Sequence, residues 1–291
     1  LWDIKTGHVF KSYSLPPKSG SVTYRSMKGY SPDGKIIIYT EGKETRYKDG
    51  KKKGKVKFRA VDTYIFSLAL NRILKVIKNV EIGKVAFSLS GRLFILNINR
   101  NVYGKDSIFS GGKSLTEFWD IATLQRKRII HEGWARYYGF SDDDKKIILV
   151  DKNNVLHLRD TATGNELLKV YLFRDEEWIA ITPEGYYNAS QYGHKYLSIR
   201  YGNRVAGINQ FYDVFYRPDI VEAKLKGEKI DDLIELTIDE AVKYPPPDVK
   251  IATVPGTSKK KEVTVDYQVQ STGGGIGDIR VYQNGKLVQS D

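Results

Sequence analysis

The chain has 291 residues, of which 41% are hydrophobic and 28% charged, and its 47 basic and 35 acidic residues give a formal net charge of +12. The absence of cysteine excludes disulfides, thiolate metal ligands and a cysteine nucleophile. The longest apolar runs have about four to six residues, the length of a strand, so no segment predicts a membrane span.

A pattern of ten residues recurs along the chain and predicts two strands joined by a tight turn. Each copy is an apolar run, a Ser or Thr, turn residues and a second apolar or aromatic run. In the first copy, Ser31-Pro32-Asp33-Gly34 places Pro where its fixed φ is needed and Gly where a positive φ is favoured. The four copies occupy residues 30–39, 87–96, 140–149 and 181–190.

A second pattern alternates with the first and predicts a strand that ends in Asp, followed by a short turn. Its copies occupy residues 1–7, 60–66, 118–124 and 158–164. In its compact form the combined repeat is about 40 residues long, the length of a four-stranded propeller blade.

These motifs resemble those of WD-repeat β-propellers, through Trp2-Asp3, Trp119-Asp120 and the turn at 31–34. The repeats are degenerate, because Val61 and Arg159 replace the Trp in two copies. A sandwich of hairpins is the alternative, but it does not explain two interleaved motifs. The expected fold is all-β: four propeller blades at 21–75, 80–131, 134–172 and 176–212, and a half blade at 1–14 that implies a larger ring.

The pattern changes after residue 212. The expected domains are a propeller segment at 1–214, a helical and Pro-rich linker at 215–247, and the start of an immunoglobulin-like sandwich at 248–291. Pro218-Asp219 is a predicted helix start, and Pro245-Pro246-Pro247 ends the helical region. Asn284-Gly285 predicts a two-residue hairpin turn in the last segment.

Residues 175–190, 194–221, 246–251 and 273–288 are similar to the tail of bacterial WD-repeat proteins in which a propeller and a short sandwich precede a caspase-like peptidase domain. The resemblance implies a regulatory and scaffolding segment. The catalytic His and Cys of that family cannot be assigned to this chain, so no catalytic, cofactor-binding or metal-binding residue is predicted.

Two insertions are expected between the second and third strands of adjacent blades, at 43–55 and 99–114, and hence on the same propeller face. Loops carry function more often than strands do, so this face is the candidate for partner binding. The first insertion supplies a candidate anion- or partner-binding loop, and the second a candidate partner-face loop. The residues are Lys48, Lys51, Lys52, Lys53 and Lys55 in the first, and Arg100, Tyr103, Lys105 and Phe109 in the second. A solvated surface loop is the alternative interpretation of the lysines.

Other motifs favour structural roles. The four histidines lack metal-ligand spacing. The glycine-rich run at 273–277 lacks the Lys-Ser/Thr of a phosphate loop. Asp142-Asp143-Asp144 fits a turn better than a cation site, and Trp178, Tyr186 and Tyr187 fit packing better than peptide binding.

The expected function is a non-catalytic interaction scaffold that binds a protein or peptide on the propeller face and is coupled to a downstream effector domain. The alternative is a basic propeller that binds nucleic acid or another polyanion. An enzyme whose active site lies outside this segment is a third interpretation. No cofactor is expected.

Overall fold

The computed structural model describes residues 5–9, 15–16, 24–46, 48, 50–51, 54, 56–100, 113–132, 135–253, 257, 262–283 and 286–290. The chain divides into two compact units. Unit 1 comprises residues 1–154 and 159–164, and unit 2 comprises residues 155–158 and 165–291. Within the described ranges, none of the helices has the length and apolarity needed to cross a membrane.

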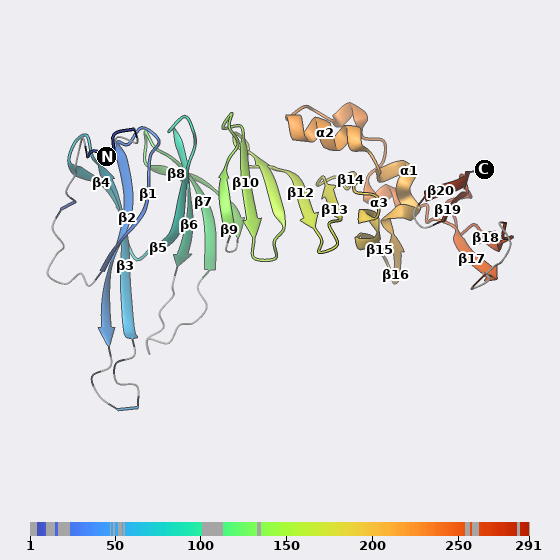
Figure 1. Cartoon of the computed structure of the whole chain (residues 1–291), viewed down its shortest axis with the longest axis horizontal. Helices are drawn as coiled ribbons and strands as arrows, with labels where there is room; N and C mark the ends of the chain where they lie inside the picture. Colours follow the sequence, from blue (N-terminus) through green and yellow to red (C-terminus); the bar gives the residue numbers. More distant parts are fainter. Residues whose placement is uncertain are drawn as a thin grey trace. The chain divides into compact units, whose positions relative to one another are not determined.

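Unit 1 contains two sheets of four antiparallel strands, and in each the strand order follows the chain order (Figure 1). The first sheet consists of β1 (Tyr24–Tyr30), β2 (Ile36–Arg46), β3 (Val56–Ser67) and β4 (Arg72–Ile77). The second consists of β5 (Glu81–Phe87), β6 (Leu93–Arg100), β7 (Lys113–Asp120) and β8 (Gln125–Glu132). These sheets coincide with the first two expected blades.

The first repeated motif forms the turns at the start of these sheets. In each turn a serine hydroxyl accepts a hydrogen bond from the backbone N–H five residues later. The pairs are Ser31 with Ile36 (2.9 Å), Ser88 with Leu93 (3.1 Å) and Ser141 with Lys146 (2.9 Å). The hydroxyl of Ser31 also donates to Asp33 over 2.6 Å, which helps to hold the pKa of that carboxyl below its ordinary value. The motif therefore recurs because its hydroxyl provides a hydrogen-bond acceptor for a backbone N–H of the turn.

In two of its copies the second motif forms the tight turn after a strand. In the copy at 60–66 the prediction is wrong, because Asp62 lies inside β3 and accepts from the Asn79 backbone N–H (3.0 Å) instead. The Asp120 carboxylate accepts from the Thr123 backbone N–H (2.8 Å) and from its hydroxyl (3.0 Å). Asp160 accepts from Thr163 in the same way, over 2.6 and 2.7 Å. An aspartate that accepts from the residue three positions on stabilises a tight turn.

Two further strands in unit 1, β9 (Ala135–Phe140) and β10 (Lys146–Asp151), form an antiparallel hairpin. One core cluster joins the first and second sheets, and another joins the second sheet to this hairpin. Asp144, in the β9–β10 turn, accepts from the backbone N–H groups of Leu89 (2.7 Å) and Ser90 (2.8 Å) in the β5–β6 turn. The turns are thus joined by a carboxylate.

Strand β11 (Leu156–Asp160) lies at the boundary between the units. Unit 2 continues with β12 (Glu166–Leu172), β13 (Trp178–Ile181), β14 (Tyr187–Ala189), β15 (Ser198–Tyr201) and β16 (Arg204–Gly207). The segment 176–212, expected to form one four-stranded blade, does contain four strands, but they lie in two sheets. Because a tight connection pairs Leu172 with Trp178, β13 and β14 extend the sheet of β12, whereas β15 and β16 pair only with each other.

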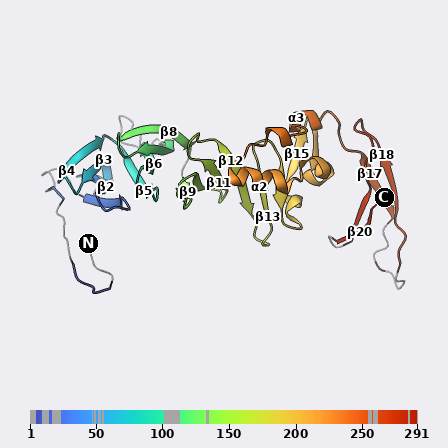
Figure 2. The same ribbon diagram turned by 90° about the horizontal axis from the view of Figure 1, so that it is seen from above.

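Short helices occur both before and within the linker predicted at 215–247. Those that begin before it are η1 (Gly193–Tyr196), between β14 and β15, and η2 (Ile208–Phe211) and α1 (Tyr212–Phe215), after β16. Those within it are α2 (Pro218–Lys226), η3 (Asp231–Leu233) and α3 (Ile238–Ala241). Helix α2 begins at Pro218, and its C-cap residue, Gly227, has a φ of 82°, as expected for a left-handed cap. It packs against β12 and β14 (Figure 2). Thr237 and Glu240 form a capping box at the start of α3.

The last strands form two separate hairpins, β17 (Asp248–Thr253) with β18 (Asp266–Gln270) and β19 (Arg280–Gln283) with β20 (Lys286–Ser290). Gln283 pairs with Lys286, the register that a two-residue turn requires, and the turn residues themselves lie outside the described ranges. The all-β class and the blade-like four-stranded sheets predicted from the sequence are confirmed.

Candidate functional site

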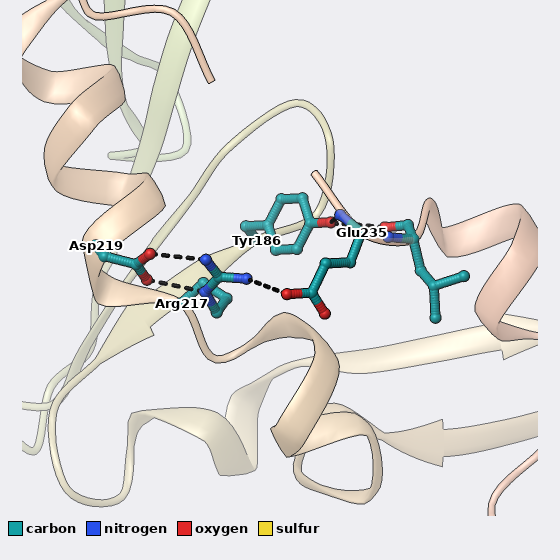
Figure 3. Close-up of polar contacts among 5 residues, drawn as sticks. Tyr186, Arg217, Asp219 and Glu235 are labelled. Carbon is teal, nitrogen blue, oxygen red and sulfur yellow. Dashed lines mark hydrogen bonds and ion pairs between the residues drawn. The ribbon is translucent and has the colours of Figure 1, made fainter. Parts of the chain in front are cut away.

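Residues 212–242, called here the connecting segment, are held on the β13–β14 turn of unit 2 by the side chain of Tyr186. The Tyr186 hydroxyl donates to the carbonyl oxygen of Leu236 over 2.8 Å and accepts from the backbone N–H groups of Glu235 (3.1 Å) and Leu236 (3.3 Å) (Figure 3). Tyr186 is fully buried. One hydroxyl thus satisfies three backbone groups of a segment about 50 residues away in the chain.

Arg217 adds a network of charges beside this tyrosine. Its guanidinium donates to both carboxylate oxygens of Asp219, over 2.9 and 2.8 Å, and to Glu235 over 3.3 Å (Figure 3). The hydrogen bonds with Arg217 hold the pKa of Asp219 below its ordinary value. The Arg217 backbone N–H donates to the Tyr187 carbonyl over 3.0 Å. The guanidinium therefore joins the start of α2 to the residues before α3, and the backbone N–H of Arg217 joins it to β14.

The turn itself contacts both α2 and α3. Lys224 of α2 donates to the Glu184 carboxylate over 2.6 Å. Gly185 has a φ of 101°, and a Cβ built on it would lie 2.5 Å from the Cδ1 atom of Ile238 in α3. Only glycine combines this backbone conformation with so close a neighbour. The turn of the fourth repeated motif is thus a docking surface for the connecting segment.

An aromatic cluster continues from β14 through α1 to β19. The rings of Tyr187 and Tyr216 lie 5.5 Å apart edge to face, and those of Tyr212 and Tyr216 stack at 4.5 Å. Arg280 of β19 lies 5.4 Å from the Tyr212 ring and donates to Asp213 over 2.6 Å. Burial raises the pKa of the Tyr187 hydroxyl above its ordinary range. The connecting segment therefore contacts both the β13–β14 hairpin and a C-terminal strand.

The sequence indicated only part of this site. Tyr186 and Tyr187 were expected in a packed core, and both are fully buried. The clamp that Tyr186 forms was not predicted, because its partners are backbone groups of Glu235 and Leu236, which carry no side-chain signal. The bonds of Arg217 to Glu235 and of Lys224 to Glu184 were missed because the partners lie 18 and 40 residues apart in the chain.

The insertion expected as a loop at 43–55 is in part a β-ribbon. Among the described residues, the pairs of β1 with β2 end at Gly42, and those of β4 with β3 begin at Thr63. The pairs that the structure describes beyond these positions are between β2 and β3, from Lys43 opposite Ala60 to Arg46 opposite Val56. Residues 43–46 thus continue β2. The sequence suggested a loop there because these residues are mostly polar, although polar residues also occur in a long hairpin.

The predicted loop residues are only partly described. Lys48 and Lys51 are exposed in the β2–β3 connection, and Arg100 is the last residue of β6, paired with Lys113. Both connections join the second and third strands of adjacent four-stranded sheets, as predicted. Lys52, Lys53, Lys55, Tyr103, Lys105 and Phe109 lie outside the described ranges.

The described residues contain no group of three or more His, Cys, Asp or Glu that could hold a metal ion. His157 pairs with Glu166 over 3.1 Å. Asp143 and Asp144 accept hydrogen bonds within and between turns, in accord with the turn interpretation. The backbone N–H of Gly274 donates to the Pro245 carbonyl over 3.2 Å, so the glycine-rich run stabilises the Pro-rich turn.

The four-stranded antiparallel sheets define an all-β protein with blades of the propeller type. No family model and no curated protein matches the chain. Among solved structures it is similar to the β-propeller domain of the Trilobed protease from Pyrococcus furiosus, which has an open velcro topology, with 14% identical residues and a TM-score of 0.35. The match covers 64% of this chain and 57% of that chain, little more than half its length.

Proposed function

We propose that this chain is a non-catalytic interaction and regulatory module. Its blades bind a protein or peptide, and the connecting segment couples that binding to the C-terminal strands. The observation that carries the proposal is the clamp of Tyr186 and Arg217, because it makes residues 212–242 a docked element rather than a free tether. A docked element responds to a change in the sheet on which it lies.

A display library of random peptides, selected on the purified chain, tests the binding part of this proposal. We expect enriched sequences that share a motif and saturate a single site in titrations. The same purified chain is expected to leave these peptides uncleaved. Failure to enrich any motif above a control protein of equal net charge would contradict the proposal.

The finer form of the proposal is that this chain is the sensing or recruiting module of a larger protein that contains a caspase-like peptidase domain. The resemblance of residues 175–290 to bacterial WD-repeat proteins supports it, and the clamp lies inside that region. If it holds, substitution of Tyr186 or Arg217 in the larger protein changes how peptidase activity responds to the ligand. Unchanged regulation in both variants would reject the coupling.

A second candidate function, binding of nucleic acid or another polyanion, is favoured by the β2–β3 ribbon. In the described part of the chain β2 and β3 remain paired beyond their pairs with β1 and β4, and residues 43–59 hold nine basic and two acidic residues. A two-stranded ribbon has dimensions that fit a major groove, and lysines that neutralise phosphates make binding steeply salt-dependent.

A charge-matched pair of variants tests this second function. Changing Lys48, Lys51, Lys52, Lys53 and Lys55 to Ser is expected to weaken RNA or DNA binding and to flatten the slope of log K against log salt by up to about four units. The control changes five exposed lysines elsewhere to Ser, namely Lys35, Lys84, Lys127, Lys145 and Lys152. Equal losses in the two variants would show non-specific attraction to net charge.

A further inference from the structure

Unit 1 contains a cavity of about 420 Å³ between its two four-stranded sheets. This volume is within the range of small-molecule sites in proteins. Its lining comes from four strands: Lys75 and Ile77 of β4, Ile98 of β6, Glu117 and Trp119 of β7, and Gln125 and Arg126 of β8. None of these residues belongs to the clamp or to the basic ribbon.

The cavity is built around a buried carboxylate. Glu117 is 1% exposed, and its two oxygens accept from the Trp119 indole N–H (3.0 Å) and from Arg126 (2.9 Å). The contact with Arg126 fixes one end of that guanidinium, although the side chain as a whole is 44% exposed. Glu117 therefore positions both the aromatic ring and a cation at the cavity.

Lys75 supplies a second cation beside the Trp119 ring. The Lys75 ammonium donates to the Leu124 carbonyl over 2.7 Å and lies 5.4 Å from the centre of the Trp119 ring. An ammonium has three donors and a guanidinium five, so in the described part of the chain both Lys75 and Arg126 retain donors beyond their contacts with Leu124 and Glu117. Two cations and one carboxylate leave a single positive charge in the lining.

We propose that this cavity binds a small monocarboxylate with an apolar or aromatic body. The single excess charge matches one carboxylate, whereas a phosphate dianion would leave a negative charge uncompensated beside the buried Glu117. Lys75 and Arg126 donate to the carboxylate, and Ile77 and the accessible edge of Trp119 contact the body of the ligand. This ligand is distinct from the partner proposed for the blades and the ribbon.

Isothermal titration of the intact chain with four probes tests the site. Benzoate carries both the charge and the ring, acetate lacks the ring, benzamide lacks the charge, and inorganic phosphate carries more charge. We expect benzoate to bind with a stoichiometry of one and at least about tenfold more tightly than the other three. No measurable binding of benzoate, or equal binding of benzamide, would overturn the proposal.

Single substitutions test whether benzoate binds in this cavity. Arg126→Gln is expected to weaken benzoate binding by about tenfold or more, because a charge-assisted hydrogen bond is lost. Lys127→Gln is the matched control: it is the next residue of β8, has the same charge and is 45% exposed, and it pairs with Asp120 instead. We expect this control to bind benzoate within about twofold of the parent.

Arg126→Gln also removes the cation from a buried carboxylate and can unfold the sheet. Lys75→Gln is therefore the second variant, since it leaves the contact between Glu117 and Arg126 intact, and the same weakening is expected. If benzoate binding persists unchanged in Lys75→Gln, or falls equally in Lys127→Gln, the cavity is not the site.

Discussion

The hydroxyl of Tyr186 lies 2.8 Å from the carbonyl oxygen of Leu236, and this contact joins a β-turn to a segment 50 residues further along the chain. Around it, Arg217 and Gly185 add an ion-pair network and a close backbone approach. The contacts make the turn of the fourth repeated motif the platform on which the connecting segment lies. The proposed coupling depends on this platform.

Tyr186→Phe removes the hydroxyl and leaves part-buried backbone groups of Glu235 and Leu236 without this partner. We expect the free energy of unfolding to fall by about 1–3 kcal/mol and amide exchange to quicken around residues 230–241. Tyr244→Phe is the control, because Tyr244 is 64% exposed. Equal effects in the two variants would show that the Tyr186 hydroxyl does not hold the segment.

Gly185→Ala tests the close approach of α3. Alanine at a φ of 101° is strained, and its Cβ would meet Ile238, so we expect a loss of more than about 2 kcal/mol in urea unfolding. Gly202→Ala separates the two causes, since Gly202 has a φ of 56° and no atom within 4 Å of its would-be Cβ. The control should lose about 1 kcal/mol. Ile238 also packs on the core, so Ile238→Ala has a cost of its own, and we expect that cost to be smaller in the Gly185→Ala variant than in the parent because the clash is relieved.

Asp175 predicts a pH dependence of stability. Its carboxylate accepts from Lys195 and from the Tyr196 hydroxyl, each over 2.7 Å, and these bonds lower its pKa from 3.8 to about 2. Because the pKa is lower in the folded state, the contribution is complete above pH 3.8 and is lost as the pH falls toward 2. We expect Asp175→Asn to flatten the fall in melting temperature over this range. Asp232→Asn, at an exposed position in η3, should retain the parent's dependence.

Asp144 predicts a stabilising contact between turns in unit 1. Asp144→Ala removes the acceptor of two backbone N–H groups, at Leu89 and Ser90, and should lower the free energy of unfolding by about 1 kcal/mol. Asp142→Ala is the adjacent, exposed control and should have little effect. Calcium should not raise the melting temperature of the parent. A clear calcium-dependent rise would restore the cation-site interpretation of Asp142-Asp143-Asp144.

Local chemistry explains which elements the sequence predicts. Ser31 and Asp120 bond to groups three to five residues away, so their turns can be read from short motifs. The start of α2 at Pro218 is equally local. By contrast, the assignment of β13 and β14 to the sheet of β12 depends on strand pairing, which the repeat spacing does not specify.

The candidate sites also combine features that the local sequence predicts with features that depend on strand pairing. The basic residues of the first insertion are visible as composition, but the ribbon that leads to them depends on pairing between residues 43–46 and 56–60. The cavity was not predicted, because Lys75, Glu117 and Arg126 belong to three different strands. Only the packing of two sheets brings such side chains together.

The most direct test of the account is titration of the chain with a display-selected peptide at low and at high salt. We predict one saturable site whose affinity changes little with salt, and peptide binding that slows amide exchange in residues 212–242. Absence of saturable peptide binding, together with nucleic-acid binding that depends steeply on salt and is lost when the five lysines of the first insertion become serines, would contradict the interaction module and establish a polyanion-binding propeller instead.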